Sequence, residues 1–137
     1  MYEYKGLCHC GAIGFTYRCT VPVEEWAVRE CQCSFCRLHA SRNVSDPAGN
    51  VQFHFNDEPK LERYRFGSKT TDFLLCKCCG VYLAAYLNSP AGEFATININ
   101  AIQPRVNVKP GMPMDYDAET SDDKRTRREV RWTPVIQ

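Results

Sequence analysis

The chain has 137 residues, a length typical of one domain, with 24% charged and 12% aromatic residues. Its formal net charge of +1 lacks the strongly basic balance of nucleic-acid-binding proteins, and no stretch approaches the ~18 consecutive apolar residues of a membrane span. The N-terminal segment shows no basic stretch followed by an apolar run, so we expect no secretory signal and a cytoplasmic location. We therefore predict a single domain over residues 1–137 that binds neither nucleic acid nor a membrane. The sequence leaves its oligomeric state open.

Short segments rich in β-branched and aromatic residues, separated by turn signals, predict a mainly β fold of short antiparallel strands. Residues 2–7 and 12–17 flank the first cysteine pair and form a predicted hairpin, and residues 26–29 form a predicted strand. One helical turn is expected over residues 35–40. The remaining predicted strands follow in chain order at residues 51–55, 61–66, 71–75, 81–87 and 94–99.

The C-terminal part, residues 104–137, begins with a proline-rich stretch and is predicted to be irregular, with one short helix around residues 118–127. An acidic run from Asp115 to Asp123 precedes a basic run from Lys124 to Arg128. Neighbouring runs of opposite charge usually cancel on a solvated surface. We interpret this segment as such a surface, with a local phosphate or carboxylate site as the alternative.

Seven of the nine cysteines fall into three short motifs, which in chain order are Cys8-x-Cys10-Gly11, Cys31-x-Cys33-x-x-Cys36 and Cys76-x-x-Cys79-Gly80. Cys19 and Cys78 lie outside this pattern. The odd count and the expected cytoplasmic location argue against a disulfide framework. A redox pair would open a helix after a strand, whereas the third motif lies between two predicted strands. The spacing therefore favours zinc, a tetrahedral ion that thiolates in short C-x-x-C turns can bind.

Seven ligands divide most naturally into a closed site of four and an open site of three, because structural zinc is four-coordinate and catalytic zinc keeps one position free. The closed site would tie the N-terminal hairpin to a distant strand pair through Cys8, Cys10, Cys76 and Cys79. The second site would use Cys31, Cys33 and Cys36, with water or a ligand in the fourth position. His39 is the alternative fourth ligand, which would close that site. Glycines directly after Cys10 and Cys79 predict tight turns with positive φ.

The three motifs together resemble the glutathione-dependent formaldehyde-activating enzyme family, which also includes centromere protein V. The resemblance covers about residues 4–100 and implies a β-tent-like fold with two zinc ions. It also implies that the four-cysteine set holds a structural zinc and the three-cysteine set a catalytic zinc. The reaction it implies joins glutathione to formaldehyde, giving S-hydroxymethylglutathione, a carbon–sulfur lyase reaction in its synthetic direction. One departure is Leu75, where the family often has an aromatic residue.

A mechanism consistent with these residues lets a substrate thiol enter the open zinc position, lose its proton and attack an aldehyde. His39 is the predicted catalytic proton donor, with His9 as a second candidate. Arg37 and Arg42 lie near the second motif and are predicted to bind the carboxylates of a glutathione-like thiol. Ordinary surface positions are the alternative for all four side chains.

Two function classes therefore compete. The first is a zinc enzyme of the carbon–sulfur lyase type, which acts on a small-molecule thiol and an aldehyde. The second is a zinc-stapled binding module in which both metal sites are structural. The fourth ligand of the second motif separates them, because water or a thiol favours the enzyme, whereas His39 or Cys19 favours the module.

Overall fold

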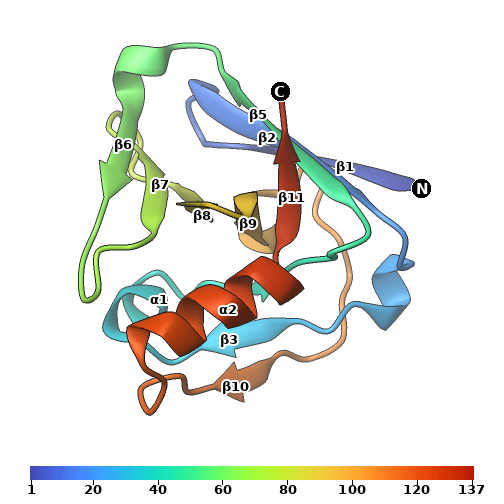
Figure 1. Ribbon diagram of the computed structural model, residues 1–137. Helices are drawn as coiled ribbons and strands as arrows, with labels where there is room; N and C mark the ends of the chain where they lie inside the picture. Colours follow the sequence, from blue (N-terminus) through green and yellow to red (C-terminus); the bar gives the residue numbers. More distant parts are fainter.

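The computed structural model describes residues 1–137, and strands dominate its regular structure (Figure 1). Eleven strands form one sheet. One end of that sheet contains, in spatial order, β1 (Tyr2–Leu7), β2 (Ile13–Cys19), β5 (Asn50–Phe55) and β11 (Thr133–Ile136). The first three strands pair antiparallel, whereas β11 runs parallel to β5. The prediction of a mainly β fold with mostly antiparallel pairing is confirmed.

The sheet branches at β9, because two strands share one of its edges. The strands beyond the first end are, in chain order, β3 (Arg29–Cys31), β4 (Asn43–Val44), β6 (Leu61–Tyr64), β7 (Asp72–Cys76), β8 (Tyr82–Ser89), β9 (Gly92–Asn98) and β10 (Met112–Met114). On β9, Phe94 and Ala95 pair with β11, while Ile97 and Asn98 pair with β4. The opposite edge of β9 pairs with β8, which continues to β7 and β6. One branch therefore leads through β4 to β3 and β10, and the other through β8 to β7 and β6.

Two α-helices and three 3-10 turns complete the fold: η1 (Val23–Glu25), α1 (Ser34–Leu38), η2 (Glu58–Lys60), η3 (Ile99–Ala101) and α2 (Ser121–Arg131). Figure 1 shows α1 and α2 on the side of the molecule that holds β3 and β10, away from β1 and β2. A capping box starts α2, because the Thr120 hydroxyl accepts the Asp123 backbone N–H at 3.1 Å and the Asp123 carboxylate accepts the Thr120 N–H. No helix is both long and apolar enough to cross a membrane.

Two expectations about secondary structure are corrected. The segment 104–137, expected to be irregular, contains β10, α2 and β11, and the helix covers Ser121–Arg131 rather than 118–127. Long-range pairing creates this order, since β10 lies parallel to β3, and β11 lies between β5 and β9. The strand expected at 26–29 begins only at Arg29. Trp26 and Val28 lie in irregular chain, although their side chains are buried in the core.

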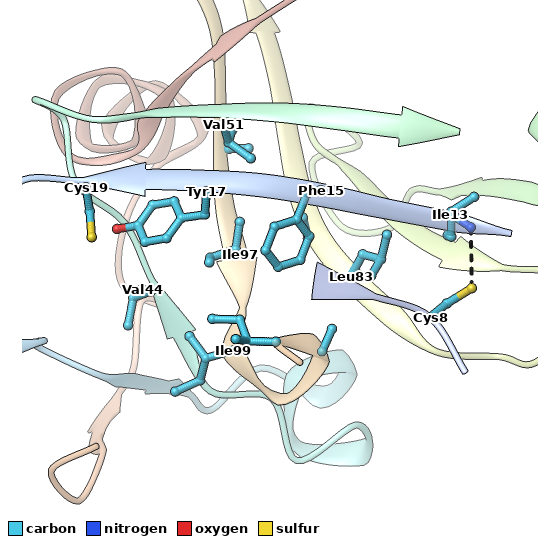
Figure 2. Packing of buried hydrophobic residues seen from close by; sticks show 14 of the residues in the cluster. Cys8, Ile13, Phe15, Tyr17, Cys19, Val44, Val51, Leu83, Ile97 and Ile99 are labelled. Carbon is cyan, nitrogen blue, oxygen red and sulfur yellow. Dashed lines mark hydrogen bonds between the residues drawn. The ribbon is translucent and has the colours of Figure 1, made fainter. Parts of the chain in front are cut away.

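The larger core lies between the β1–β2–β5 end of the sheet and strands β8 and β9 (Figure 2). Its fully buried side chains include Phe15, Tyr17, Val51, Leu83 and Ile97. Burial of each such side chain contributes roughly 1.5–3 kcal/mol to folding. Gly6 permits the close approach of β1, because a Cβ atom there would lie 2.2 Å from the ring of Phe15. This core therefore fixes the hairpin that carries the first cysteine motif.

A smaller core lies between α1 and strands β7 and β8. Its buried members are Phe35, Cys36, Phe73, Tyr82, Ala85, Leu87 and Trp132. Cys31 and Cys33 pack against it. The second cysteine motif is therefore seated on an apolar cluster built from α1, β7, β8 and the residue that follows α2.

Candidate metal centres and the cavity beside them

The first and third cysteine motifs meet at one point of the fold. The sulfurs of Cys8, Cys10, Cys76 and Cys79 all lie within 4.8 Å of one another. Cys10 Sγ lies 3.8 Å from Cys8 Sγ and 3.5 Å from Cys76 Sγ. Four sulfurs around a tetrahedral zinc ion, each about 2.3 Å from it, would lie about 3.8 Å apart. The spacing of the four sulfurs therefore fits a tetrahedrally coordinated metal ion.

Local backbone geometry holds these sulfurs in place. Gly11 and Gly80 adopt φ angles of 84° and 77°, which confirms the predicted tight turns. The backbone N–H of Ile13 donates to Cys8 Sγ at 3.4 Å, as the dashed line in Figure 2 shows. The Cys79 N–H donates to Cys76 Sγ at the same distance. All nine cysteines are free thiols, so the disulfide alternative finds no support.

The second motif forms a three-sulfur cluster from one short segment. Cys31 ends β3, Cys33 caps the N-terminus of α1, and Cys36 lies within that helix. Their sulfurs lie within 4.8 Å of one another, and no further His, Cys, Asp or Glu side chain joins them. The Cys33 sulfur accepts the Cys36 backbone N–H at 3.4 Å. Hydrogen bonds from the thiols of Cys31 and Cys36 lower the pKa of Cys33.

The two side chains expected as a possible fourth ligand of this cluster are engaged elsewhere. His39 caps the end of α1, where its Nδ1 lies 3.0 Å from the carbonyl oxygen of Phe35 and its ring stacks on the Phe35 ring at 4.2 Å. Cys19 is buried in the larger core and its thiol donates to the carbonyl oxygen of Val21. The three-sulfur cluster therefore differs from the four-sulfur cluster in lacking a fourth protein ligand.

A cavity of about 120 Å³ lies beside the three-sulfur cluster and is lined by all three of its cysteines. Phe66, Phe73 and Trp132 supply apolar wall. The hydroxyl of Tyr82 is buried against this cavity and has no hydrogen-bond partner. Burial raises the pKa of Tyr82, so its hydroxyl stays protonated and available as a donor.

The charged side chains of the cavity are mostly basic and come from β3 and α2. They are Arg29, Lys124, Arg127 and Arg128, with Asp117 as the acidic residue among the lining side chains. Burial lowers the pKa of both Arg29 and Arg128. The cavity therefore combines three thiols, an orphan hydroxyl and a positively charged wall.

The arginines predicted to bind substrate carboxylates do not line this cavity. Arg37 is exposed on α1, and the Nε atom of Arg42 donates to the Asn100 side chain at 2.7 Å. His9 is exposed in the turn between Cys8 and Cys10, beside the other cluster. The roles assigned to His39, Arg37 and Arg42 stay predictions.

The basic run from Lys124 to Arg128 was interpreted from the sequence as a solvated surface, with a local phosphate or carboxylate site as the alternative. Three of its side chains line the cavity. Lys124, Arg127 and Arg128 have the i, i+3, i+4 spacing that places side chains on one face of a helix. The capping box at Thr120 is the sequence feature that marks where this helix begins. Arg29 had no such signal, because its place in the cavity depends on the pairing of β3 with β4 and β10.

Comparisons with known proteins agree with this geometry. Residues 3–117 match the family model described as glutathione-dependent formaldehyde-activating enzyme. Among solved structures, the crystal structure of a Rhodobacter sphaeroides protein is similar, with 27% sequence identity and a TM-score of 0.58. The similarity covers 75% of this chain and 90% of that chain. The family match includes both cysteine clusters and ends before α2 begins.

Proposed function

Because the chain belongs to the glutathione-dependent formaldehyde-activating enzyme family, we propose that it joins a glutathione-like thiol to a small aldehyde such as formaldehyde. The reaction is of the carbon–sulfur lyase type in its synthetic direction, and we place it in the cytoplasm, where thiols remain reduced. The observation that carries this proposal is the three-sulfur cluster, which has no fourth protein ligand and opens into a cavity. A structural zinc site is closed by four protein ligands and needs no adjoining cavity.

Both clusters have the donor set that suits zinc, a metal bound by thiolates in tetrahedral geometry. Cys8, Cys10, Cys76 and Cys79 would hold a structural ion, and Cys31, Cys33 and Cys36 would hold the second. When bound there, zinc supplies a coordination position at which a thiol is deprotonated near neutral pH.

The chain's own residues would then orient the aldehyde and keep water away. Phe66, Phe73 and Trp132 line the cavity with apolar surface, which limits competing hydration of the aldehyde. The protonated Tyr82 hydroxyl can donate to the carbonyl oxygen, where negative charge develops. The sulfur–carbon bond forms as the carbonyl π bond breaks, and the proton released by the thiol is finally recovered on the new hydroxyl group. No oxidant or reductant is consumed.

His39 retains its predicted role as the group that moves this proton. Its ring lies 5.8 Å from the ring of Tyr82, measured between centroids, with Phe35 stacked against it. Arg37 and Arg42, on and just after α1, retain their predicted role toward the distant carboxylates of a tripeptide thiol that extends outside the cavity.

Cobalt substitution tests the proposed function. Protein loaded with Co²⁺ is titrated with glutathione while the thiolate-to-metal charge-transfer band is recorded, and formaldehyde consumption is followed with the zinc form. We expect a saturable change in the band and loss of that change in Cys33→Ser. A band that no thiol alters would support the alternative, a binding module with purely structural metal sites.

A further inference from the structure

We propose that the cavity beside the three-sulfur cluster recognises a carboxylate group of a small substrate through Arg128, assisted by Arg29. This inference rests on the proposed function, because it identifies the class of molecule that reacts at that site. It concerns a helix that lies beyond the family-matched residues 3–117.

The first observation is the difference between two adjacent arginines of α2. Arg127 forms an ion pair with Glu119, to which its Nε and Nη2 atoms donate at 3.0–3.1 Å. Its guanidinium carbon lies 3.6 Å from the centre of the Tyr116 ring. Arg128 forms no ion pair. Its Nη1 atom donates to the Thr71 hydroxyl at 2.6 Å, and its buried Nε has no partner at all. Arg128 therefore has unused donors, whereas Arg127 uses its donors in the ion pair with Glu119.

Arg29, on β3, repeats this arrangement at the same cavity. Its Nη2 atom donates to the hydroxyls of Ser45 and Thr96 at 2.7 and 3.0 Å, and it also forms no ion pair. Neutral hydroxyls orient a guanidinium group without cancelling its charge. Neither half-buried guanidinium group pairs with a carboxylate, although Glu119 and the sulfurs of Cys31 and Cys33 attract Arg128 electrostatically. Two such sets of donors facing one cavity favour an anionic ligand.

Contacts on both sides of Arg128 hold it in place before any ligand arrives. Glu129 accepts a hydrogen bond from the Ser89 hydroxyl at 2.7 Å, and the carbonyl oxygen of Arg131 accepts one from Ser45 at 2.8 Å. The guanidinium carbon of Arg128 lies 5.1 Å from the centre of the Trp132 ring. An arginine fixed in this way loses little side-chain entropy when it binds a planar carboxylate in a bidentate manner.

The size of the cavity limits the ligand. Sites that enclose drug-sized molecules have volumes of roughly 300–1,000 Å³, whereas this cavity has about 120 Å³. Arg128 and all three cysteines line this one space, so the carboxylate must lie within a few bonds of the reacting sulfur or carbon. Glutathione and formaldehyde offer no carboxylate at this distance, so one of the two reactants is instead a short mercapto acid or an α-oxo acid such as glyoxylate.

The test compares an acid with its uncharged amide. Zinc-loaded and cobalt-loaded protein are titrated with 3-mercaptopropionate and with 3-mercaptopropionamide, and binding is measured by calorimetry and by the charge-transfer band. We expect the acid to bind at least ten-fold more tightly. In Arg128→Met, affinity for the acid should fall roughly 10- to 100-fold, the range expected for hydrogen bonds to a charged group, while affinity for the amide stays within about three-fold.

Arg125→Met is the matched control, because Arg125 lies on the same helix but pairs with Asp122 and does not line the cavity. This variant should bind both thiols as the unsubstituted protein does. Thermal unfolding and zinc content of both variants establish that they fold and hold metal. A glyoxylate and glycolaldehyde pair, titrated in the same way, shows whether the aldehyde carries the carboxylate instead. A preference for glyoxylate that Arg128→Met abolishes would support the proposal equally.

A readout independent of thiol binding separates this proposal from the proposed function. Propionate, which has no thiol, should shift the indole N–H resonance of Trp132 in the NMR spectrum and leave that of Trp26, in the larger core, unchanged. If no thiol alters the cobalt spectrum but propionate still shifts Trp132 in an Arg128-dependent manner, the function fails and carboxylate recognition stands. Equal binding of the charged and the uncharged member in both pairs would overturn the proposal. Equal weakening of both members of each pair in Arg128→Met would also overturn it, since Arg128 would then act only through the charge of the metal cluster.

Discussion

The two cysteine clusters use the same ligand atom but are connected to the chain in different ways. The four-sulfur cluster joins the β1–β2 turn to the β7–β8 turn, so a bound ion would cross-link segments that are 66 residues apart. The three-sulfur cluster comes from one segment, Cys31 to Cys36, and cross-links nothing distant. We therefore expect a metal ion in the first cluster to contribute to folding and a metal ion in the second to leave the fold largely unchanged.

The surroundings of the two clusters also differ, because only the second cluster faces polar groups without partners. Glycine turns and backbone donors complete the first cluster, and no further chemical group is needed there. The second faces a cavity with an unpartnered hydroxyl and two arginines that form no ion pair. Buried polar groups usually have partners, so unused donors beside an incomplete ligand set indicate where a substrate supplies what the protein lacks.

Loss of a ligand from the four-sulfur cluster should have the largest effect. Structural zinc contributes roughly 10–16 kcal/mol in small zinc domains, which exceeds the stability of most domains of this size. We expect Cys76→Ser to lose that ion and to unfold at room temperature, as measured by circular dichroism and metal analysis. Cys78→Ser is the control, because Cys78 lies exposed in the same turn but outside the cluster. A Cys76→Ser protein with two zinc ions and an unchanged melting temperature would contradict the structural role.

The same substitution in the three-sulfur cluster should change binding but not folding. Serine suits position 33 because the side chain there caps α1 by accepting the Cys36 N–H, and serine is a favourable N-cap residue. We expect Cys33→Ser to hold one zinc ion per chain, to lose all response to thiols, and to melt within a few degrees of the unsubstituted protein. Cooperative loss of both ions would show that the clusters are not independent.

We expect Tyr82→Phe to lower activity without lowering stability. Removing a buried hydroxyl that has no partner costs no hydrogen bond, so the free energy of unfolding should stay the same or rise by up to ~1 kcal/mol. Formaldehyde consumption should fall roughly 10- to 100-fold, because the donor to the developing oxyanion is lost. The control is Tyr86→Phe on the same strand, whose hydroxyl donates to Glu93 instead. That variant should keep its activity, and a Tyr82→Phe protein of full activity would remove Tyr82 from the mechanism.

Asp46 lies outside both clusters, so a substitution there tests acid unfolding that does not depend on metal. Burial raises the pKa of Asp46, but hydrogen bonds from Thr20 and from the Ala48 N–H outweigh it, so the pKa lies below the ordinary value of 3.8. A depressed pKa in the folded state stabilises the protein above pH ~4, and this stabilisation is lost as the pH falls through the folded-state pKa.

We therefore expect Asp46→Asn to lower the free energy of unfolding by about 1–3 kcal/mol at pH 7, with the difference shrinking below pH ~4. Urea unfolding at several pH values measures this difference. The acid destabilisation that Asp46→Asn retains should follow zinc release, because protons compete with the metal for thiolates. A difference that stays constant down to pH 2 would exclude the carboxylate as its source.

The cysteine motifs were predictable because the spacing within each motif is local, whereas the meeting of the first motif with the third joins segments 66 residues apart. C-x-C and C-x-x-C motifs bring sulfurs together through one turn of chain, whatever the rest of the fold does. The glycine turns at Gly11 and Gly80 follow from the same local requirement. By contrast, Arg29, Tyr82 and Arg128 line one cavity only because distant strands pair. One edge of β9 pairs with both β4 and β11, and β11 directly follows α2. Such pairing between distant segments leaves no local signal, and for that reason the C-terminal segment was expected to be irregular.

Zinc analysis before and after a mild chelator tests the central contrast most directly. Protein purified without chelators should contain two zinc ions per chain. After brief treatment with a chelator of moderate affinity, one ion should remain, circular dichroism should be unchanged, and Cys33→Ser should start from that one-ion state. A single ion from the outset, or two ions that leave together as the protein unfolds, would contradict a closed site and an open site in one fold.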